Sequence, residues 1–177
     1  YIVNMDNSVV ITSAVRTAVG SLGKSLKNIS GDNLGSSVIS ESISKSKIKS
    51  DEIDEVIMGQ VLTGGAGQNP ARQAAMKSGI PKEKPAYIVN QVCGSGLRSI
   101  ASGFQSIKAG DSKIIIAGGQ ESMSLAPHTI HLRDGKKLGD IEMTDTMIKD
   151  GLWDAFHGYH MGVTAENVAT KFQVTRD

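Results

Sequence analysis

The sequence predicts an α/β protein in which a mostly parallel, mixed β-sheet is covered by helices. Short β-branched runs alternate with segments whose apolar residues recur at helical spacing. Glycine is abundant, at 20 of 177 residues, and aromatic residues make up only 4%, which suits many tight strand–helix turns. Residues 113–119 hold a continuous β-branched run, which predicts a strand buried on both faces, as in a parallel sheet.

The first part of the pattern predicts two strands and two helices. Residues 9–14 are a β-branched run that predicts a strand, and residues 32–49 carry apolar side chains at helical spacing. Residues 55–59 predict a second strand, which is followed by a glycine-rich stretch at residues 63–67. Asn69 can cap the next helix, Pro70 fits its first position and Gly79 can close it.

Predicted strands and helices continue to alternate up to residue 119, and this alternation then stops. Residues 86–92 and 113–119 predict a third and a fourth strand, and a helix with one apolar face begins between them at Gly94. Residues 120–162 show no regular period, which predicts an excursion from the sheet. Thr164 can cap a helix that ends at Phe172. Thr175 predicts the start of a further helix, so we expect the chain to be part of a longer protein.

Charge and composition exclude several classes of function. The formal net charge is only +1 and the lysines are scattered, so we expect no nucleic-acid partner. No apolar stretch is long enough to span a bilayer, so we expect no membrane partner and a cytoplasmic location, or the mitochondrial matrix in a eukaryote. The single cysteine excludes an internal disulfide and a cysteine-rich metal site.

Cys93 is the candidate catalytic residue because of its position in the chain. It lies at the junction of a predicted strand and a predicted helix, where ligands bind in open α/β sheets. Backbone N–H groups at a helix start favour the thiolate, and Gly94 and Gly96 allow a substrate to approach closely. The alternative, a small buried hydrophobic residue, is more typical of cysteines in mid-strand or on an apolar helix face. The pattern therefore favours a nucleophile.

A nucleophilic cysteine also needs a base, because a helix terminus stabilises a charge by only about 0.3–1 kcal/mol. The base is usually a histidine, and the four candidates are His128, His131, His157 and His160. We rank His160 first, because it precedes a capped helix and could line a cleft wall together with Met161. The spacing of each histidine fits a polar loop residue equally well, and Met161 also fits plain core filling.

A second glycine-containing segment follows the fourth predicted strand, at residues 118–124. It ends at the same edge of the sheet as Cys93, so a phosphate-binding turn is conceivable there. Its spacing matches neither a dinucleotide-binding fingerprint nor a P-loop, which disfavours that interpretation.

Four separated segments resemble the thiolase family, in the same order as in that family. The segment around Cys93 is similar to the nucleophile motif, and the segment at residues 118–124 is similar to the one that follows the family's fourth strand. The segments at residues 67–73 and 160–167 are also thiolase-like. The resemblance covers essentially the whole chain, and we identify the chain as the N-terminal part of a member of this family.

The resemblance implies that Cys93 takes an acyl group from one acyl-CoA and passes it to a second acyl-CoA ionised at its α carbon. The Cys93 N–H would be one donor of an oxyanion hole. Leu152, His160 and Met161 would line the tunnel for the acyl and pantetheine groups. Coenzyme A thioesters would be substrates, and no metal or redox cofactor would be needed.

Further details of the resemblance point to the short-chain branch of the family. Met161 and residues 132–139 are most similar to the branch that forms acetoacetyl-CoA from two acetyl-CoA, which implies an acetyl-CoA C-acetyltransferase activity. In that branch, a loop that corresponds to about residues 126–143 joins dimers into a homotetramer. The domains implied are a nucleophile-bearing α/β domain at residues 1–119 and the start of a tetramerisation and substrate-binding region at residues 120–177.

One departure from the family is large. The activating histidine and the second, acid/base cysteine of thiolases have no counterpart in these residues, and we expect both in an absent C-terminal half. Residues 1–177 alone are therefore expected to be inactive.

Two alternatives to this function stay open. One is a longer-chain 3-ketoacyl-CoA thiolase of fatty-acid breakdown, which pocket volume would distinguish. The other is a non-catalytic acyl or lipid carrier with the same fold, which the missing base motivates and the intact Cys93 motif disfavours.

Overall fold

The structure, a computed structural model, describes residues 8–177. The chain divides into two compact units, one that ends at Leu125 and one that runs from Ala126 to Asp177. The first unit holds a parallel sheet with its helices, and the second holds a short hairpin and a C-terminal helix.

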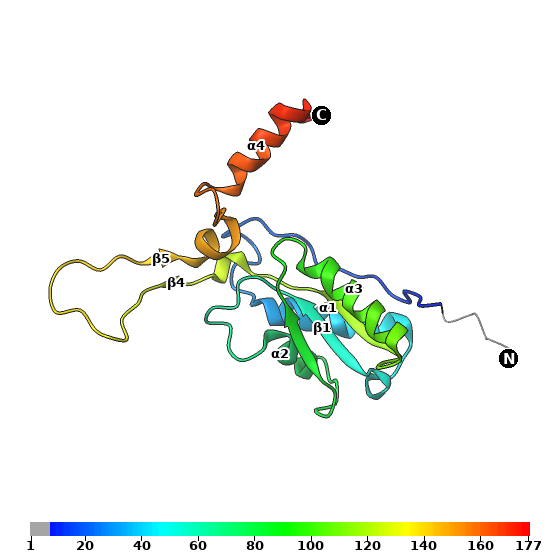
Figure 1. Cartoon of the computed structure of the whole chain (residues 1–177). Coiled ribbons are helices and arrows are strands. Elements are labelled where there is room, and N and C mark those ends of the chain that lie inside the picture. Colours follow the sequence, from blue (N-terminus) through cyan, green and yellow to red (C-terminus); the bar gives the residue numbers. More distant parts are fainter. Residues whose placement is uncertain (1–7) are drawn as a thin grey trace. The chain divides into compact units, whose positions relative to one another are not determined.

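The first unit is built around a three-stranded parallel sheet (Figure 1). Its strands are β1 (Glu55–Gly59), β2 (Ala86–Val89) and β3 (Ile115–Gly119), in the order β2-β1-β3. In this register, Val56 of β1 lies opposite Ala86 on one side and Ile116 on the other. Because all three strands are parallel, their carboxyl ends lie at one edge of the sheet. The predicted α/β class is confirmed.

Three helices cover this sheet: α1 (Gly31–Ser46), α2 (Pro70–Lys77) and α3 (Ser95–Ala109), with a short 3₁₀ helix η1 (Ser50–Glu52) before β1. Side chains alternate along β1, so the two faces of the sheet have different neighbours. Val56 and Met58 belong to the core that α1 and α2 complete, whereas Gly59 meets the first turn of α3. The members of this core are Ile39, Ile53, Val56, Met58, Ala71, Ala74, Ala75 and Ile80.

The helices and strands begin and end for local reasons. As predicted, Asn69 caps α2: its side chain accepts a hydrogen bond from the Arg72 N–H at 3.2 Å, and Pro70 is the first helical residue. α1 ends three residues earlier than predicted, because Lys47 takes a left-handed conformation that closes the helix. β3 starts at Ile115 rather than at residue 113, because the carboxylate of Asp54 accepts the N–H groups of the two preceding residues.

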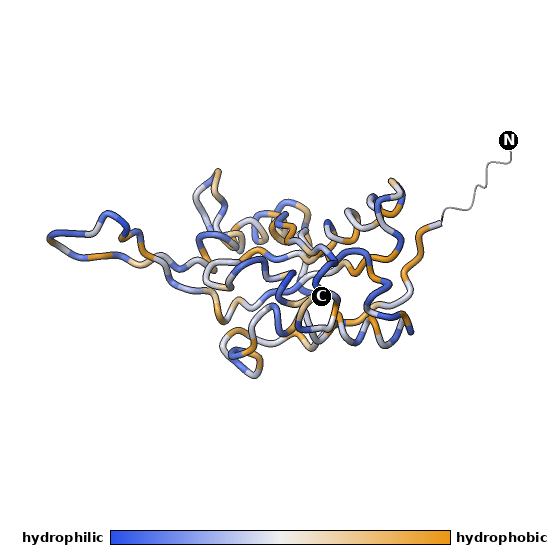
Figure 2. Tube along the Cα trace, turned by 90° about the horizontal axis from the view of Figure 1, so that it is seen from below, coloured by the Kyte–Doolittle hydropathy of each residue, from blue (hydrophilic) through white to orange (hydrophobic). Residues whose placement is uncertain are grey.

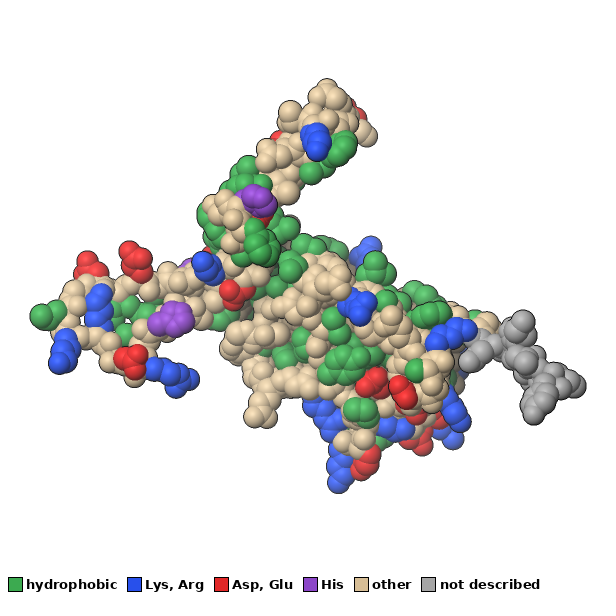
Figure 3. All heavy atoms as spheres, viewed as in Figure 1, with side chains coloured by type: hydrophobic (Ala, Val, Ile, Leu, Met, Phe, Trp, Pro, Cys, Tyr) green, Lys and Arg blue, Asp and Glu red, His purple; other side chains and the backbone are tan. Residues whose placement is uncertain are grey.

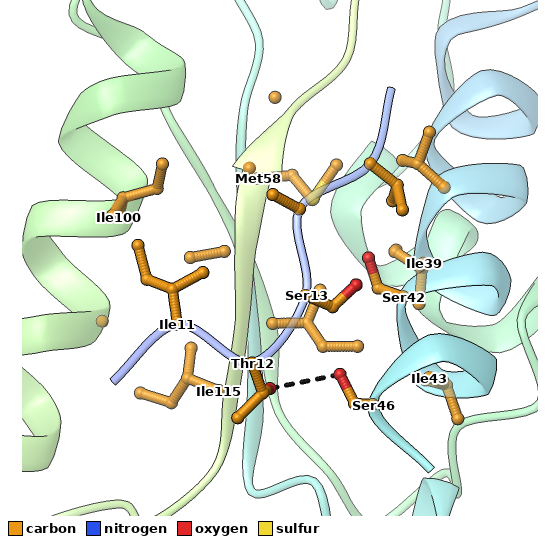
Figure 4. A pocket seen from close by; sticks show the side chains of 18 of the residues that line it. Ile11, Thr12, Ser13, Ile39, Ser42, Ile43, Ser46, Met58, Ile100 and Ile115 are labelled. Carbon is orange, nitrogen blue, oxygen red and sulfur yellow. Dashed lines mark hydrogen bonds between the residues drawn. The ribbon is translucent and has the colours of Figure 1, made fainter. Parts of the chain in front are cut away.

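The predicted strand at residues 9–14 does not form. This segment is hydrophobic (Figure 2), but no strand pairs with it. A cavity of about 600 Å³ lies between the segment, the free edge of β3 and the helices α1 and α3 (Figure 4). A side-chain bond of 3.1 Å between Thr12 and Ser46 links the segment to α1. A β-branched composition alone therefore does not make a strand, which also needs a hydrogen-bonded partner.

The second unit has little regular structure before its last helix. The strands β4 (His128–Thr129) and β5 (Thr144–Asp145) form a short antiparallel pair at the base of a long loop. A single π-helical segment, η3 (Met147–Leu152), follows β5, and the chain ends with α4 (Met161–Phe172). The predicted cap of that last helix was wrong, because His160 is the N-cap and Thr164 lies inside the helix. The helix predicted to start at Thr175 stays a prediction, because its body was expected outside these residues.

Two features do not occur within residues 8–177. None of the helices there is long and apolar enough to cross a membrane. The same residues contain no group of three or more histidine, cysteine, aspartate or glutamate side chains that could hold a metal ion.

Candidate active site

Cys93 lies in the turn that joins β2 to α3, at the carboxyl edge of the parallel sheet. β2 ends at Val89 and α3 begins at Ser95, so the turn holds only five residues. The thiol of Cys93 is exposed to solvent. An exposed sulfur at this edge of the sheet can be reached by a substrate, in contrast to a buried structural cysteine.

Backbone hydrogen bonds fold the turn tightly. The Gly94 N–H donates to the Gln91 carbonyl at 3.0 Å, and the Ser95 N–H donates to the Val92 carbonyl at 3.1 Å. The Asn90 side chain accepts a bond from the Val92 N–H at 3.0 Å, and β2 ends at Val89 rather than at residue 92, where the sequence predicted its end. Val92 has a φ of 48°, a left-handed conformation that is uncommon for a β-branched residue. Backbone strain of this kind clusters at functional sites.

The hydroxyl of Ser95 ties the two sides of this turn together. It accepts a bond from the Gln91 N–H at 2.9 Å and donates to the Val92 carbonyl at 2.6 Å. Ser95 is only 4% exposed, so both bonds are shielded from water. The buried side chain of Ser95 therefore holds the carbonyl group of Val92, the residue directly before Cys93.

Glycines let the first turn of α3 rest directly on the strand ends. A Cβ atom at Gly59 would lie 2.4 Å from the carbonyl carbon of Ser95, and one at Gly119 would lie 3.3 Å from the Cα of Gly96. Real Cβ atoms essentially never approach another atom within 3.0 Å. The absence of a side chain at Gly59 therefore allows the start of α3 to lie close to the sheet. The turn that carries Cys93 directly precedes this point.

Glu121 fastens two loops to each other at the same edge of the sheet. Its carboxylate accepts the Val61 N–H at 2.8 Å and the Leu62 N–H at 3.3 Å, so the loop after β3 holds the loop after β1. Burial raises the pKa of Glu121, and the backbone N–H groups of Val61 and Leu62 oppose this shift. A carboxylate in this position argues against the phosphate-binding turn that the glycines at residues 118–119 suggested.

Leu152, His160 and Met161 all belong to the second unit, where the structure brings them to one place. An antiparallel bridge pairs Trp153 with His160, so in this register Leu152 and Met161 lie on the same side of that bridge. The Nδ1 atom of His160 accepts the Gly162 N–H at 2.9 Å. With Nδ1 as the acceptor of this bond, Nε2 is the ring nitrogen that can donate.

The other three histidines lie in the same unit and have polar surroundings. His157 Nδ1 is 2.9 Å from Asp154, whose pKa is lowered chiefly by the backbone N–H groups of His157 and Phe156. His128 is 3.8 Å from Asp145, and His131 is exposed.

Comparisons with known proteins settle the family. Residues 9–177 match the profile of the family described as "Thiolase, N-terminal domain". The chain belongs to the thiolase family. An acetyl-CoA acetyltransferase of Rhizobium meliloti is 59% identical over 170 residues, which are 96% of this chain and 43% of that protein. The cytosolic acetyl-CoA acetyltransferase of the rat is 52% identical over 169 residues, again 96% of this chain and 43% of the relative.

A solved structure agrees with the sequence relatives. A thiolase from Ascaris suum in complex with coenzyme A superposes with a TM-score of 0.88 at 38% identity, over 94% of this chain and 43% of that chain. This thiolase chain therefore spans less than half the length of the proteins that it matches.

The sequence predicted Cys93 as a site residue but did not mark the residues that hold its turn and the neighbouring loops. Asn90, Ser95 and Glu121 act through hydrogen bonds to backbone groups, and no periodicity marks such bonds. The available signal was local: a serine between Gly94 and Gly96 at a helix start is placed to bond to the preceding turn.

Proposed function

We propose that this thiolase is an acetyl-CoA acetyltransferase in which Cys93 accepts the acetyl group. The observation that carries the proposal is the exposed thiol of Cys93 in a tightly bonded strand–helix turn at the carboxyl edge of the sheet. Relatives named acetyl-CoA acetyltransferase at 49–59% identity support this choice of acyl group.

The first step is acetyl transfer to the enzyme. The thiolate of Cys93 attacks the thioester carbon of acetyl-CoA, a new C–S bond forms, and the carbonyl electrons move to oxygen. The tetrahedral intermediate then collapses, and its bond to the sulfur of coenzyme A breaks. The departing CoA thiolate takes up the proton that Cys93 gave to the base. Acetyl-Cys93 and free CoA result, with no change in oxidation state, so the chemistry needs no redox group.

The oxygen of the intermediate carries a negative charge and needs hydrogen-bond donors. The Gly94 and Ser95 N–H groups are already bonded within the turn. The Cys93 N–H is not one of the two N–H groups that close the turn, and we propose it as one such donor.

The second step forms the carbon–carbon bond. A second acetyl-CoA loses a proton from its α carbon, and the carbanion attacks the carbonyl carbon of acetyl-Cys93. The bond to sulfur then breaks, which releases acetoacetyl-CoA and returns the Cys93 thiolate. The group that removes the α proton is expected outside these residues, because Cys93 is the only thiol of the chain.

The second unit is proposed to receive the acyl and pantetheine groups. Leu152 and Met161 supply apolar surface, and the Nε2 proton of His160 is a donor for a carbonyl oxygen of the substrate. Met161 is 37% exposed, and its flexible side chain can adapt to a bound chain.

The loop between β4 and β5 is proposed to join dimers into a homotetramer. It exposes several apolar side chains, with Leu138 at 89%, Met143 at 61% and Ile141 at 47% exposure, and such exposed apolar surface marks interaction sites. Light scattering of the full-length protein tests this: deletion of residues 132–141 should convert a tetramer to a dimer. A tetramer that survives the deletion would contradict the role of the loop.

Cleavage of acetoacetyl-CoA by CoA tests the activity itself. The full-length protein should form two acetyl-CoA per turnover, and a Cys93→Ala variant should lose more than about 10³-fold of the rate. A preference for a medium-chain 3-ketoacyl-CoA would identify a longer-chain thiolase instead. A folded wild-type protein that binds acyl-CoA without turnover would favour the carrier hypothesis.

A further inference from the structure

We propose that Ser95 is a positioning residue: its buried hydroxyl aims the Cys93 N–H at the thioester oxygen. The inference rests on Cys93 being the acetyl acceptor proposed above. It concerns a residue that lies beside the nucleophile and acts on the substrate only through the backbone.

The direction of the Cys93 N–H follows from the peptide unit to which it belongs. That unit also contains the Val92 carbonyl, and in a trans peptide the C=O and the N–H point in opposite directions. No peptide bond of residues 8–177 is cis. Ser95 holds the Val92 carbonyl with its hydroxyl at 2.6 Å and with its backbone N–H at 3.1 Å. The Cys93 N–H is therefore directed away from Ser95.

The strained backbone at Val92 explains why the Val92–Cys93 peptide needs hydrogen bonds to hold its orientation. A valine with a φ of 48° is in a region that disfavours β-branched residues, so the backbone alone would prefer another conformation. Rotation of the Val92–Cys93 peptide would exchange the positions of the carbonyl and the N–H. A carbonyl oxygen would then face the developing oxyanion and repel it. The Ser95 hydroxyl opposes that rotation directly, and the Asn90 side chain, which holds the Val92 N–H, fixes the preceding peptide unit.

Ser99 provides a matched control one turn further along α3. It is also buried, and its hydroxyl lies 2.6 Å from the carbonyls of Gly96 and Gly118. Both serines thus bond to backbone carbonyls from inside the protein. Only the bond of Ser95 reaches the peptide that contains the Cys93 N–H.

The test compares two reactions of Cys93 in the full-length protein. Acetylation by acetyl-CoA passes through an oxyanion, whereas alkylation by iodoacetamide displaces iodide from a saturated carbon and forms none. Rates of both are read by rapid quenching and mass analysis of the Cys93 peptide. Ser95→Ala should lower the acetylation rate at least tenfold and leave alkylation within twofold. Ser99→Ala should leave both rates within twofold of the wild type.

Asn90→Ala extends the test to an exposed position, where folding is not at risk. We expect the same selective loss of acetylation, to a smaller extent of about threefold, as befits an exposed hydrogen bond. Equal loss of both reactions in Ser95→Ala would show a general structural role and overturn the inference. If Ser95→Ala does not fold, unchanged acetylation in Asn90→Ala would overturn it. A wild-type protein that alkylates but is never acetylated at Cys93 would instead refute the proposed function.

Discussion

The two units of this thiolase chain differ in what holds them together. All the buried hydrophobic residues that the structure describes lie in the first unit, among them Ile39, Ile53 and Ile57 at no more than 1% exposure. In the second unit, large apolar side chains lie in solvent, with Phe156 at 95% and Phe172 at 65% exposure. The first unit is shaped by long-range packing, and the second by short-range hydrogen bonds.

Those short-range bonds are visible in the second unit. Asp145 accepts from the N–H of Met147, Asp154 accepts from two N–H groups of the next turn, and His160 caps α4. Such bonds specify local backbone shape but bury little apolar surface. A change at a buried position should therefore cost much in the first unit and little in the second.

The first unit also exposes apolar residues, but only on particular surfaces. Leu97, Ile100 and Phe104 of α3 are 74%, 42% and 49% exposed, and hydrophobic side chains gather on the face that carries this helix (Figure 3). The helix that follows the Cys93 turn therefore has one face packed on the sheet and one face open.

The largest effect is expected from Gly59→Ala. The added Cβ would lie 2.4 Å from the backbone of Ser95, which no side-chain rotation can relieve. We expect a loss of about 4 kcal/mol or more in the free energy of unfolding of the first unit. Hydrogen exchange of the β1 amides, read by mass spectrometry, measures this loss.

Gly158→Ala is the matched control in the second unit. Gly158 has a φ of 75° and no atom within 4 Å of an added Cβ, so the substitution meets backbone strain alone. It should cost about 1 kcal/mol, confined to the second unit. Equal losses in the two variants would contradict a difference in packing.

The next effect tests the core itself. Ile53 is fully buried in the core, so Ile53→Ala should lower the free energy of unfolding by about 3 kcal/mol. Phe156→Ala removes a larger side chain that is 95% exposed, and it should change the stability by less than about 0.5 kcal/mol. A comparable loss for Phe156 in the isolated chain would mean that the second unit has packing of its own.

Helix capping should give a smaller effect. Asn69→Ala removes the bond to the Arg72 N–H and a 2.8 Å bond to the Ala86 carbonyl, and it should cost about 1 kcal/mol. Asn69→Gly tolerates the positive φ of 42° and separates the cost of the lost bonds from that of the backbone conformation. If the free energy of unfolding in urea is unchanged in both variants, the Asn69 side chain does not stabilise the start of α2.

The smallest effect is a pH dependence at Asp54. The N–H of Lys113, followed by that of Ile114, lowers the pKa of this carboxyl below 3.8. An acid with a lowered pKa stabilises the fold above its unfolded value of about 3.9, and this stability is lost as the pH falls through the folded value. The stability difference between wild type and Asp54→Asn should therefore be constant from pH 7 to 5 and shrink below pH 4. A difference that is the same at pH 3 would contradict the assignment.

The parts of the fold that the sequence predicted are those with a local cause. Asn69 and Pro70 marked the start of α2, and the β-branched run at residues 55–59 gave β1 with the same bounds. Residues 9–14 have the same β-branched character, yet they form no strand, because strand formation also needs a partner. The sequence could not show that this segment lines a cavity beside β3 without pairing with that strand.

In the candidate site, too, only features with a local sequence signal could be predicted. Cys93 was predicted because glycines and a strand–helix junction can be recognised in the sequence. Ser95 and Val92 were missed because a left-handed valine and the hydroxyl that holds it leave no periodic signal. The cap of α4 was misassigned to Thr164 because histidine is not among the preferred cap residues, although its Nδ1 accepts the required bond.

The central claim is that Cys93 receives the acetyl group, and mass analysis of the full-length protein tests it most directly. The protein is incubated with acetyl-CoA, quenched in acid within a turnover, digested and mapped. We predict one acetyl group per chain, located on the peptide that contains Cys93, and none on the same peptide of a Cys93→Ala variant. Acetylation that persists in Cys93→Ala, or that maps to another residue of the wild type, would contradict the account.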